Sequence, residues 1–155
     1  MLKTIHPVAG VVALLTIATF WLSSVLSELF GSTAAIVAVK TSIPWGFLLL
    51  VPALAAVGGS GFALAQGVRD GLIGAKRRRM PIIAANGVLI LIPSALFLAA
   101  KARAGELDAS FDFVQALELA AGATNITLLA LNLRDGLKLT GRIGRRALSE
   151  SKADA

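Results

Sequence analysis

The chain has 155 residues, of which 56% are hydrophobic and 15% are charged, and its formal net charge at pH 7 is +6. A soluble domain carries about 25% charged residues, and a soluble protein with this composition would expose large apolar patches. Cysteine is absent, which excludes a disulfide framework, a thiolate metal site and haem attached through cysteine. The sequence has no phosphate-binding loop, zinc-ligand spacing or nucleophile elbow, so nucleotide-driven or hydrolytic catalysis is not expected.

Four apolar segments follow one another at residues 7–29, 42–66, 80–100 and 111–133. Roughly 20 apolar residues suffice to cross the hydrocarbon core of a bilayer as a helix. The first segment is longer than the apolar core of a signal peptide, so we expect it to be retained. The sequence therefore predicts an all-α polytopic membrane protein. We expect a four-transmembrane-helix bundle over residues 1–135 and a basic cytoplasmic tail over residues 136–155.

Basic residues are distributed unequally between the connecting segments. The N-terminus, the segment Arg69–Arg79 and the tail from Arg134 together hold twelve Lys and Arg residues. The predicted loops Glu28–Lys40 and Lys101–Asp112 together hold three. By the positive-inside rule both termini are expected in the cytoplasm, in a multi-pass protein of the cell (inner) membrane. Basic clusters beside apolar spans favour contact with anionic lipids, and no nucleic acid partner is expected.

A short sequence repeat relates the two halves of the chain. Arg-Asp-Gly-Leu occurs at residues 69–72 and again at residues 134–137, and His6-Pro7 and Met80-Pro81 open the first and third spans. A duplicated pair of helices is one explanation. The other is that both halves use common interfacial solutions, with proline in a first helical turn and glycine as a helix stop.

His6 is the only histidine and precedes Pro7 at the predicted cytoplasmic end of the first span. Gly10 and Ala13 follow at helical spacing on the same face and would let a flat ligand lie against the helix. Because imidazole is a common axial ligand of haem iron, His6 is a candidate metal ligand for haem b. The second ligand would be His6 of a partner in a homodimer, or Met80 of the same chain. The alternative is an interfacial histidine near the lipid headgroups.

Arg77, Arg78 and Arg79 lie beside Met80. They are expected to set the topology and to bind anionic lipid headgroups. They would bind the propionates of a haem located at that level of the membrane.

Glu118 is the one ionisable residue well inside a predicted span. An isolated carboxylate there costs a few kcal/mol unless it is protonated or paired. One helical seam also contains other polar or small residues, namely Gln115, Gly122, Asn125 and Asn132, and Asn86 of the third span is expected to face it. The seam is either a proton or quinone site, or a set of hydrogen bonds that hold the helices together.

Two further features concern packing. Trp21 and Trp45 fall near the outer ends of the first two spans, as an aromatic belt predicts. Pro93 is expected to kink the third span.

Two main hypotheses about function follow from these residues. The first is a small b-type haem protein for electron transfer, a homodimer with His6 as axial ligand. The second is a non-catalytic membrane subunit or assembly protein, in which the polar seam serves helix association. A proton-coupled carrier that uses Glu118 is a third possibility.

Overall fold

The computed structural model describes residues 2–64 and 71–139, and these residues form helices without any strand. Helix α1 covers Leu2–Phe30 and α2 covers Thr33–Leu64. The third span is built from α3 (Gly71–Asn86), a π-helical turn (η1, Gly87–Leu91) and α4 (Ile92–Ala104). Helix α5 covers Ala109–Leu139. The predicted all-α architecture is confirmed, while the predicted tail lies outside the described residues from position 140 onward.

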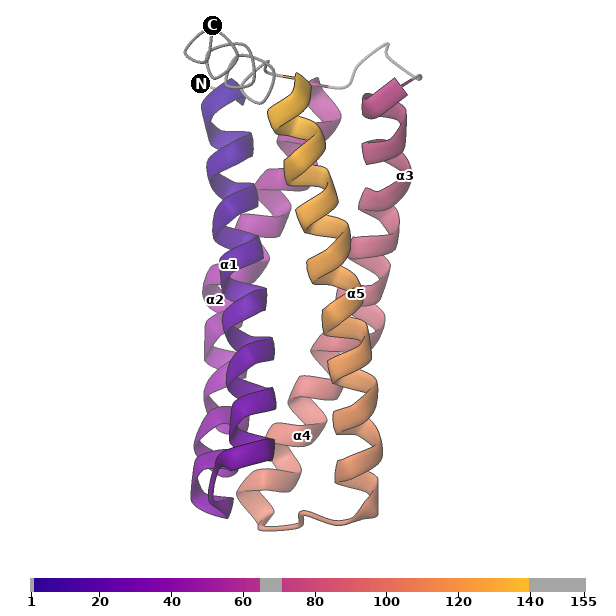
Figure 1. Cartoon of the computed structure of the whole chain (residues 1–155). Helices are drawn as coiled ribbons and strands as arrows, with labels where there is room; N and C mark the ends of the chain where they lie inside the picture. The colour runs from indigo at the N-terminus through magenta and orange to yellow at the C-terminus, as the bar shows by residue number, and fades with distance from the viewer. Residues whose placement is uncertain (1, 65–70, 140–155) are drawn as a thin grey trace, which may run out of the picture.

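The helices form one elongated bundle in which neighbouring spans run in opposite directions (Figure 1). Helix α1 packs against α2 and α5, α2 packs against α4, and α5 packs against α3, η1 and α4. Helix α1 begins and α5 ends at the same end of the bundle (Figure 1). The connections at Gly31 and Gly105 lie at the opposite end, which we call the loop end. Four segments of 27 to 31 residues are long and apolar enough to cross a membrane.

The first connection is shorter than the loop Glu28–Lys40 expected from the sequence, and that expectation is wrong. Only Gly31 and Ser32 separate α1 from α2. The Ser32 hydroxyl accepts a hydrogen bond from the Ala35 N–H at 3.3 Å, as a helix N-cap does. Lys40 therefore lies within α2, on a turn that packs inside the bundle.

The expected distortion at Pro93 takes the form of the π-helical turn that precedes it. Proline lacks an N–H and cannot donate within the helix. The N–H of Ile92 bonds to the carbonyl of Gly87, five residues back. Such single π turns are frequent at functional sites, and this one directly follows Asn86, which is expected to face the polar seam.

The surface of the bundle is apolar and much of its interior is polar. Leucine, valine, isoleucine and phenylalanine side chains are exposed along all four spans, among them Leu15, Leu48, Leu89 and Phe113. Ten of the described residues are buried and polar or charged, including Lys40 and Glu118. A lipid environment favours this arrangement, because lipid solvates exposed leucines and leaves polar groups to find partners inside the protein.

Trp21 of α1 packs against α5. Its indole N–H donates to the Leu119 carbonyl at 2.9 Å, and the ring lies against Gly122 of α5. A Cβ atom on Gly122 would come within 2.8 Å of the ring. Trp21 thus joins α1 to α5, whereas Trp45 is exposed on α2.

Candidate functional site

Five polar residues lie along the buried face of α5, namely Gln115, Glu118, Asn125, Asn132 and Asp135, and we call them the α5 seam. Their spacing keeps them on one face of the helix. Glu118 and Asp135 are separated by about 25 Å along the helix axis, at the usual rise per residue. Each of these two carboxylates binds a basic residue from another span. The seam therefore has an ion pair toward each end of the bundle.

The first ion pair joins α2 to α5. The ammonium group of Lys40 lies 2.7 Å from Oε2 of Glu118 and also donates to the Ser24 hydroxyl of α1 at 3.0 Å. The Lys40 side chain is 1% exposed and the Glu118 side chain 11% exposed. Three helices thus share one buried charge pair, and Glu118 is not the one ionisable residue inside the spans, because Lys40 of α2 lies there as well.

A small cavity of about 50 Å³ adjoins this ion pair. Ser24 and Glu118 are its polar lining residues, and Phe20, Trp21 and Phe47 contribute aromatic walls. A water molecule needs roughly 10–15 Å³ of such space together with polar partners. The cavity therefore has room for a few waters next to the Glu118 carboxylate.

Two polar side chains near the ion pair have atoms without partners. Gln115 is 6% exposed, and neither its amide oxygen nor its amide nitrogen has a hydrogen bond among the described residues. Oε1 of Glu28 is likewise buried without a partner there. Glu28 lies close enough to Lys40, Asp112 and Glu118 for their charges to act on it. A bound water or ion is one arrangement that satisfies buried groups of this kind.

The middle of the seam is hydrogen-bonded to α3. The Asn86 amide donates to Oδ1 of Asn125 and to the Ala121 carbonyl, both at 2.8 Å. The Asn125 amide donates to the Ile83 carbonyl at 3.4 Å. Asn86 therefore faces the seam, as expected from the sequence. These bonds tie α3 to α5 and so contribute to helix association.

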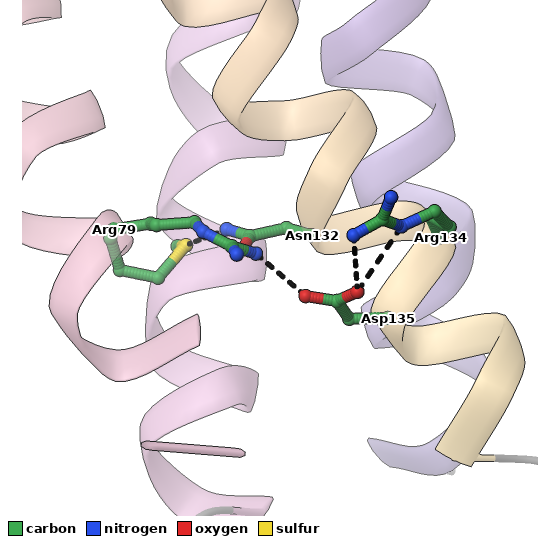
Figure 2. Close-up of polar contacts among 5 residues, drawn as sticks. Arg79, Asn132, Arg134 and Asp135 are labelled. Carbon is green, nitrogen blue, oxygen red and sulfur yellow. Dashed lines mark hydrogen bonds and ion pairs between the residues drawn. The ribbon is translucent and has the colours of Figure 1, made fainter. Parts of the chain in front are cut away.

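The second ion pair lies toward the other end of α5 (Figure 2). The Arg79 guanidinium of α3 lies 2.7 Å from Oδ2 of Asp135, and Arg134 lies 3.4 Å from Oδ1 of the same carboxylate. Asp135 is 1% exposed. The Asn132 amide donates to the Met80 thioether at 3.5 Å. Because Arg79 is bound to Asp135, it is oriented toward α5 rather than toward an external anion.

His6 binds α2. Its Nδ1 lies 2.9 Å from the Ser60 hydroxyl, and that hydroxyl donates its proton to the Ala56 carbonyl. A hydroxyl has a single proton. With that proton donated to the Ala56 carbonyl, the Ser60 oxygen accepts from Nδ1, and in this tautomer the lone pair of the ring lies on Nε2. A Cβ atom on Gly61 would come within 3.1 Å of the ring, so glycine allows this contact.

The remaining predicted haem residues are not gathered around His6. The Met80 thioether contacts Asn132 of α5, whereas the His6 ring contacts Ser60 and Gly61 of α2. Arg78 is exposed on α3. The side chain of Arg77 lies outside the described residues, as does the Arg-Asp pair at residues 69–70. Within residues 2–64 and 71–139, no three His, Asp or Glu side chains form a group suited to a metal ion.

Several members of the site are not predicted from the sequence, namely Ser24, Glu28, Lys40, Ser60 and Asp135. A charge usually marks the end of an apolar segment, and on that ground Lys40 is expected in a loop. The sequence also contains a feature that favours a helix at Lys40, since no proline and no glycine interrupts the stretch between Thr33 and Lys40. Ser24 and Ser60 have no such signal, because serine is common in membrane helices.

No family model, no curated protein sequence and no solved structure matches the chain. Its function can therefore be inferred only from the geometry of the described residues.

Proposed function

We propose that this chain is a multi-pass protein of the cell membrane, with both termini in the cytoplasm, and that it transfers protons through its polar interior. The Lys40–Glu118 ion pair is the central group of this activity. The apolar outer surface and the basic residues near the ends of α1 and α5 support the membrane location and the orientation.

The buried Lys40–Glu118 pair is the observation that carries the proposal. Removing two charges from water costs several kcal/mol per ion, and their attraction often does no more than offset that cost. A buried ion pair is therefore weak evidence for stabilisation alone. Ionisable residues within membrane spans commonly belong to proton or ion pathways.

The competing explanation is that the seam serves helix association in a non-catalytic subunit. The Asn86–Asn125 bonds fit that explanation, because each amide meets a partner on the neighbouring span. The unpaired atoms of Glu28 and Gln115 do not fit it, since an unsatisfied buried group weakens a packed interface. The adjacent water-sized cavity also favours a group that exchanges protons.

Proton flux into lipid vesicles tests the proposal. The purified protein is reconstituted with a pH-sensitive dye inside the vesicles, and a potassium diffusion potential drives the flux. Wild-type vesicles are expected to acidify several-fold faster than empty ones. Glu118→Gln removes the titratable carboxyl and is expected to reduce the rate to that of empty vesicles.

A second variant separates loss of activity from loss of folding. The double change Lys40→Met with Glu118→Leu removes both charges and keeps similar side-chain volumes, so the bundle should insert while the flux is lost. Glu106→Gln is the control, because Glu106 is exposed at the loop end outside the candidate spans. Vesicles that acidify no faster than empty ones, or Glu118→Gln vesicles that acidify at the wild-type rate, would contradict proton transfer.

A second candidate function is electron transfer by haem b in a homodimer. The hydrogen bond from Nδ1 of His6 to Ser60 supports it, because Nδ1 bonding is how proteins commonly direct Nε2 of a histidine toward a metal. Met80 is bonded to Asn132, so paired His6 residues from two copies are the better supported ligand set. The absorption spectrum of the purified protein tests this function directly.

A further inference from the structure

Glu28 and Gln115 lie at one level of the bundle, on the loop side of the Lys40–Glu118 pair. Ser24 and Glu118 bind the same ammonium group and so share a level. Helices α1 and α5 run antiparallel (Figure 1). Glu28 is one helical turn beyond Ser24, or about 6 Å, and Gln115 is nearly one turn before Glu118, or about 4.5 Å. Both displacements point toward the loop end.

Gln115 is buried in the bundle, on the same face of α5 as Glu118. It shares a helix face with Glu118, which reaches Lys40. Both of its amide atoms are buried without a partner among the described residues, as is Oε1 of Glu28. A buried amide without hydrogen bonds is costly. Bound water removes that cost with ordinary hydrogen-bond geometry.

Glu28 lies near charges of both signs. Lys40 of α2 faces it as the positive charge, while Glu118 and Asp112 of α5 are the negative ones. Asp112 is exposed at the surface near the loop end, and the Glu28 side chain is half-buried. The carboxyl group of Glu28 thus lies between the loop-end surface and the buried ion pair.

We propose that Glu28 and Gln115 bind water inside the bundle and that Glu28 exchanges protons with Glu118 through this water. In this step the carboxyl group of Glu28 gives its proton to a bound water, and that water passes one of its own protons to the Glu118 carboxylate. Glu28 becomes a carboxylate, Glu118 becomes a carboxylic acid, and the water is unchanged. This inference rests on the proposed function, because it names the partner of the Lys40–Glu118 pair on the loop side.

Infrared spectroscopy of the protein in lipid membranes tests the site without any transport assay. Glu28 is expected to give a carboxylic acid carbonyl band that shifts in D₂O, because water reaches the group. The band should disappear in Glu28→Gln and move in Glu28→Asp, which retains a carboxyl group. Gln115→Leu should shift the band, since it removes two hydrogen-bonding atoms from the site. Glu106→Gln is the control and should leave the band unchanged.

The outcomes separate this inference from the proposed function. A carboxylic acid band identical in wild type and Glu28→Gln, or one that does not respond to D₂O, overturns the water site. Wild-type flux that persists in Glu28→Gln but is lost in Glu118→Gln overturns the role of Glu28 and leaves proton transfer in place. A band that behaves as expected in a protein without flux supports the water site while proton transfer fails.

Discussion

The ammonium group of Lys40 lies 2.7 Å from the carboxylate of Glu118, 78 positions away in the chain. The contact joins the second span to the fourth. The Ser24 hydroxyl of the first span also accepts a hydrogen bond from the Lys40 ammonium group, so three spans meet at this point. Both charged groups are buried, so each is stabilised mainly by the other. The pair therefore holds three spans in one register.

Removal of one partner is expected to cost more than removal of both. Glu118→Gln or Lys40→Met should lower the free energy of unfolding by about 3–5 kcal/mol, because an unpaired charge or polar group stays buried. The double change Lys40→Met with Glu118→Leu should recover most of this loss. Thermal unfolding in detergent, followed by circular dichroism, measures the three variants against wild type.

The loop-end ion pair between Lys101 and Glu106 provides the matched control for that experiment. The Lys101 ammonium lies 2.8 Å from the Glu106 carboxylate, and the Glu106 side chain is 57% exposed. Exposed ion pairs contribute little to stability because water screens them, so Glu106→Gln should change the unfolding temperature little. If Glu106→Gln and Glu118→Gln lower the unfolding temperature equally, the buried pair contributes no more to stability than the exposed pair.

Gly46 of α2 is expected to tolerate no side chain. A Cβ atom there would overlap the ring of Phe20 on α1, so Gly46→Ala should destabilise the bundle by about 1–3 kcal/mol through overpacking. Gly58 lies on the same helix, and a Cβ atom there meets no described atom within 4 Å. Gly58→Ala should be neutral or slightly stabilising, since alanine has the higher helix propensity. Unfolding temperatures of the two variants decide whether α1 and α2 pack as closely as described.

The topology can be tested with single cysteines, because the natural chain has none. Ser32→Cys and Glu106→Cys lie in the two connections at the loop end. They should react with a membrane-impermeant maleimide added to intact cells. Ser151→Cys, in the basic tail, should react only after the cells are opened. Labelling of Ser151→Cys in intact cells would place the C-terminus outside and contradict the positive-inside assignment.

Asp108 is expected to make the start of α5 sensitive to acid. Lys101 donates to its carboxylate, and the Ser110 hydroxyl and the Phe111 N–H also donate, so the pKa of Asp108 is held well below its usual value. A carboxyl whose pKa is lower in the folded state contributes stability above its unfolded pKa and loses it as the pH falls toward the folded value. Asp108→Asn keeps a capping side chain without the titration. Unfolding temperatures measured from neutral to strongly acidic pH should therefore fall less in this variant than in wild type, and parallel curves would contradict the prediction.

The number of apolar spans and the polar face of α5 could be predicted from the sequence. Length and hydropathy determine the first, and the spacing of Gln115, Glu118 and Asn125 determines the second. The partner of Glu118 could not be predicted in this way. Local patterns favour a loop for Lys40, because a charge is cheaper at the membrane surface than in an apolar region unless a partner is known. Its pairing with Glu118 is a tertiary contact between distant spans, which local patterns do not contain.

The packing of Trp21 shows the same limit. An aromatic residue near the end of a span suits a membrane interface, and this is the common case. Trp21 also packs on Gly122, because glycine leaves space for the ring and the Leu119 carbonyl accepts its N–H. The sequence shows a tryptophan and a glycine, but not that the fourth span returns to the same place as the first.

Haem binding by His6 would have a defined stoichiometry. If two copies of the chain bind one haem b through Nε2 of His6, protein purified from haem-replete cells should have a low-spin b-type spectrum at one haem per two chains. His6→Ala should lose the haem and keep the fold. Ser60→Ala should retain His6 as the ligand but remove the hydrogen bond that orients its ring. Haem binding should therefore weaken by about 10–100-fold. Met80→Ala should leave the spectrum unchanged, since the Met80 thioether contacts Asn132.

Two outcomes would contradict this stoichiometry or the ligand. If the protein binds one haem per chain and Met80→Ala alters its spectrum, the ligands are His6 and Met80 of the same chain rather than His6 of two copies. A colourless protein, or haem retained in His6→Ala, would exclude His6 as an axial ligand.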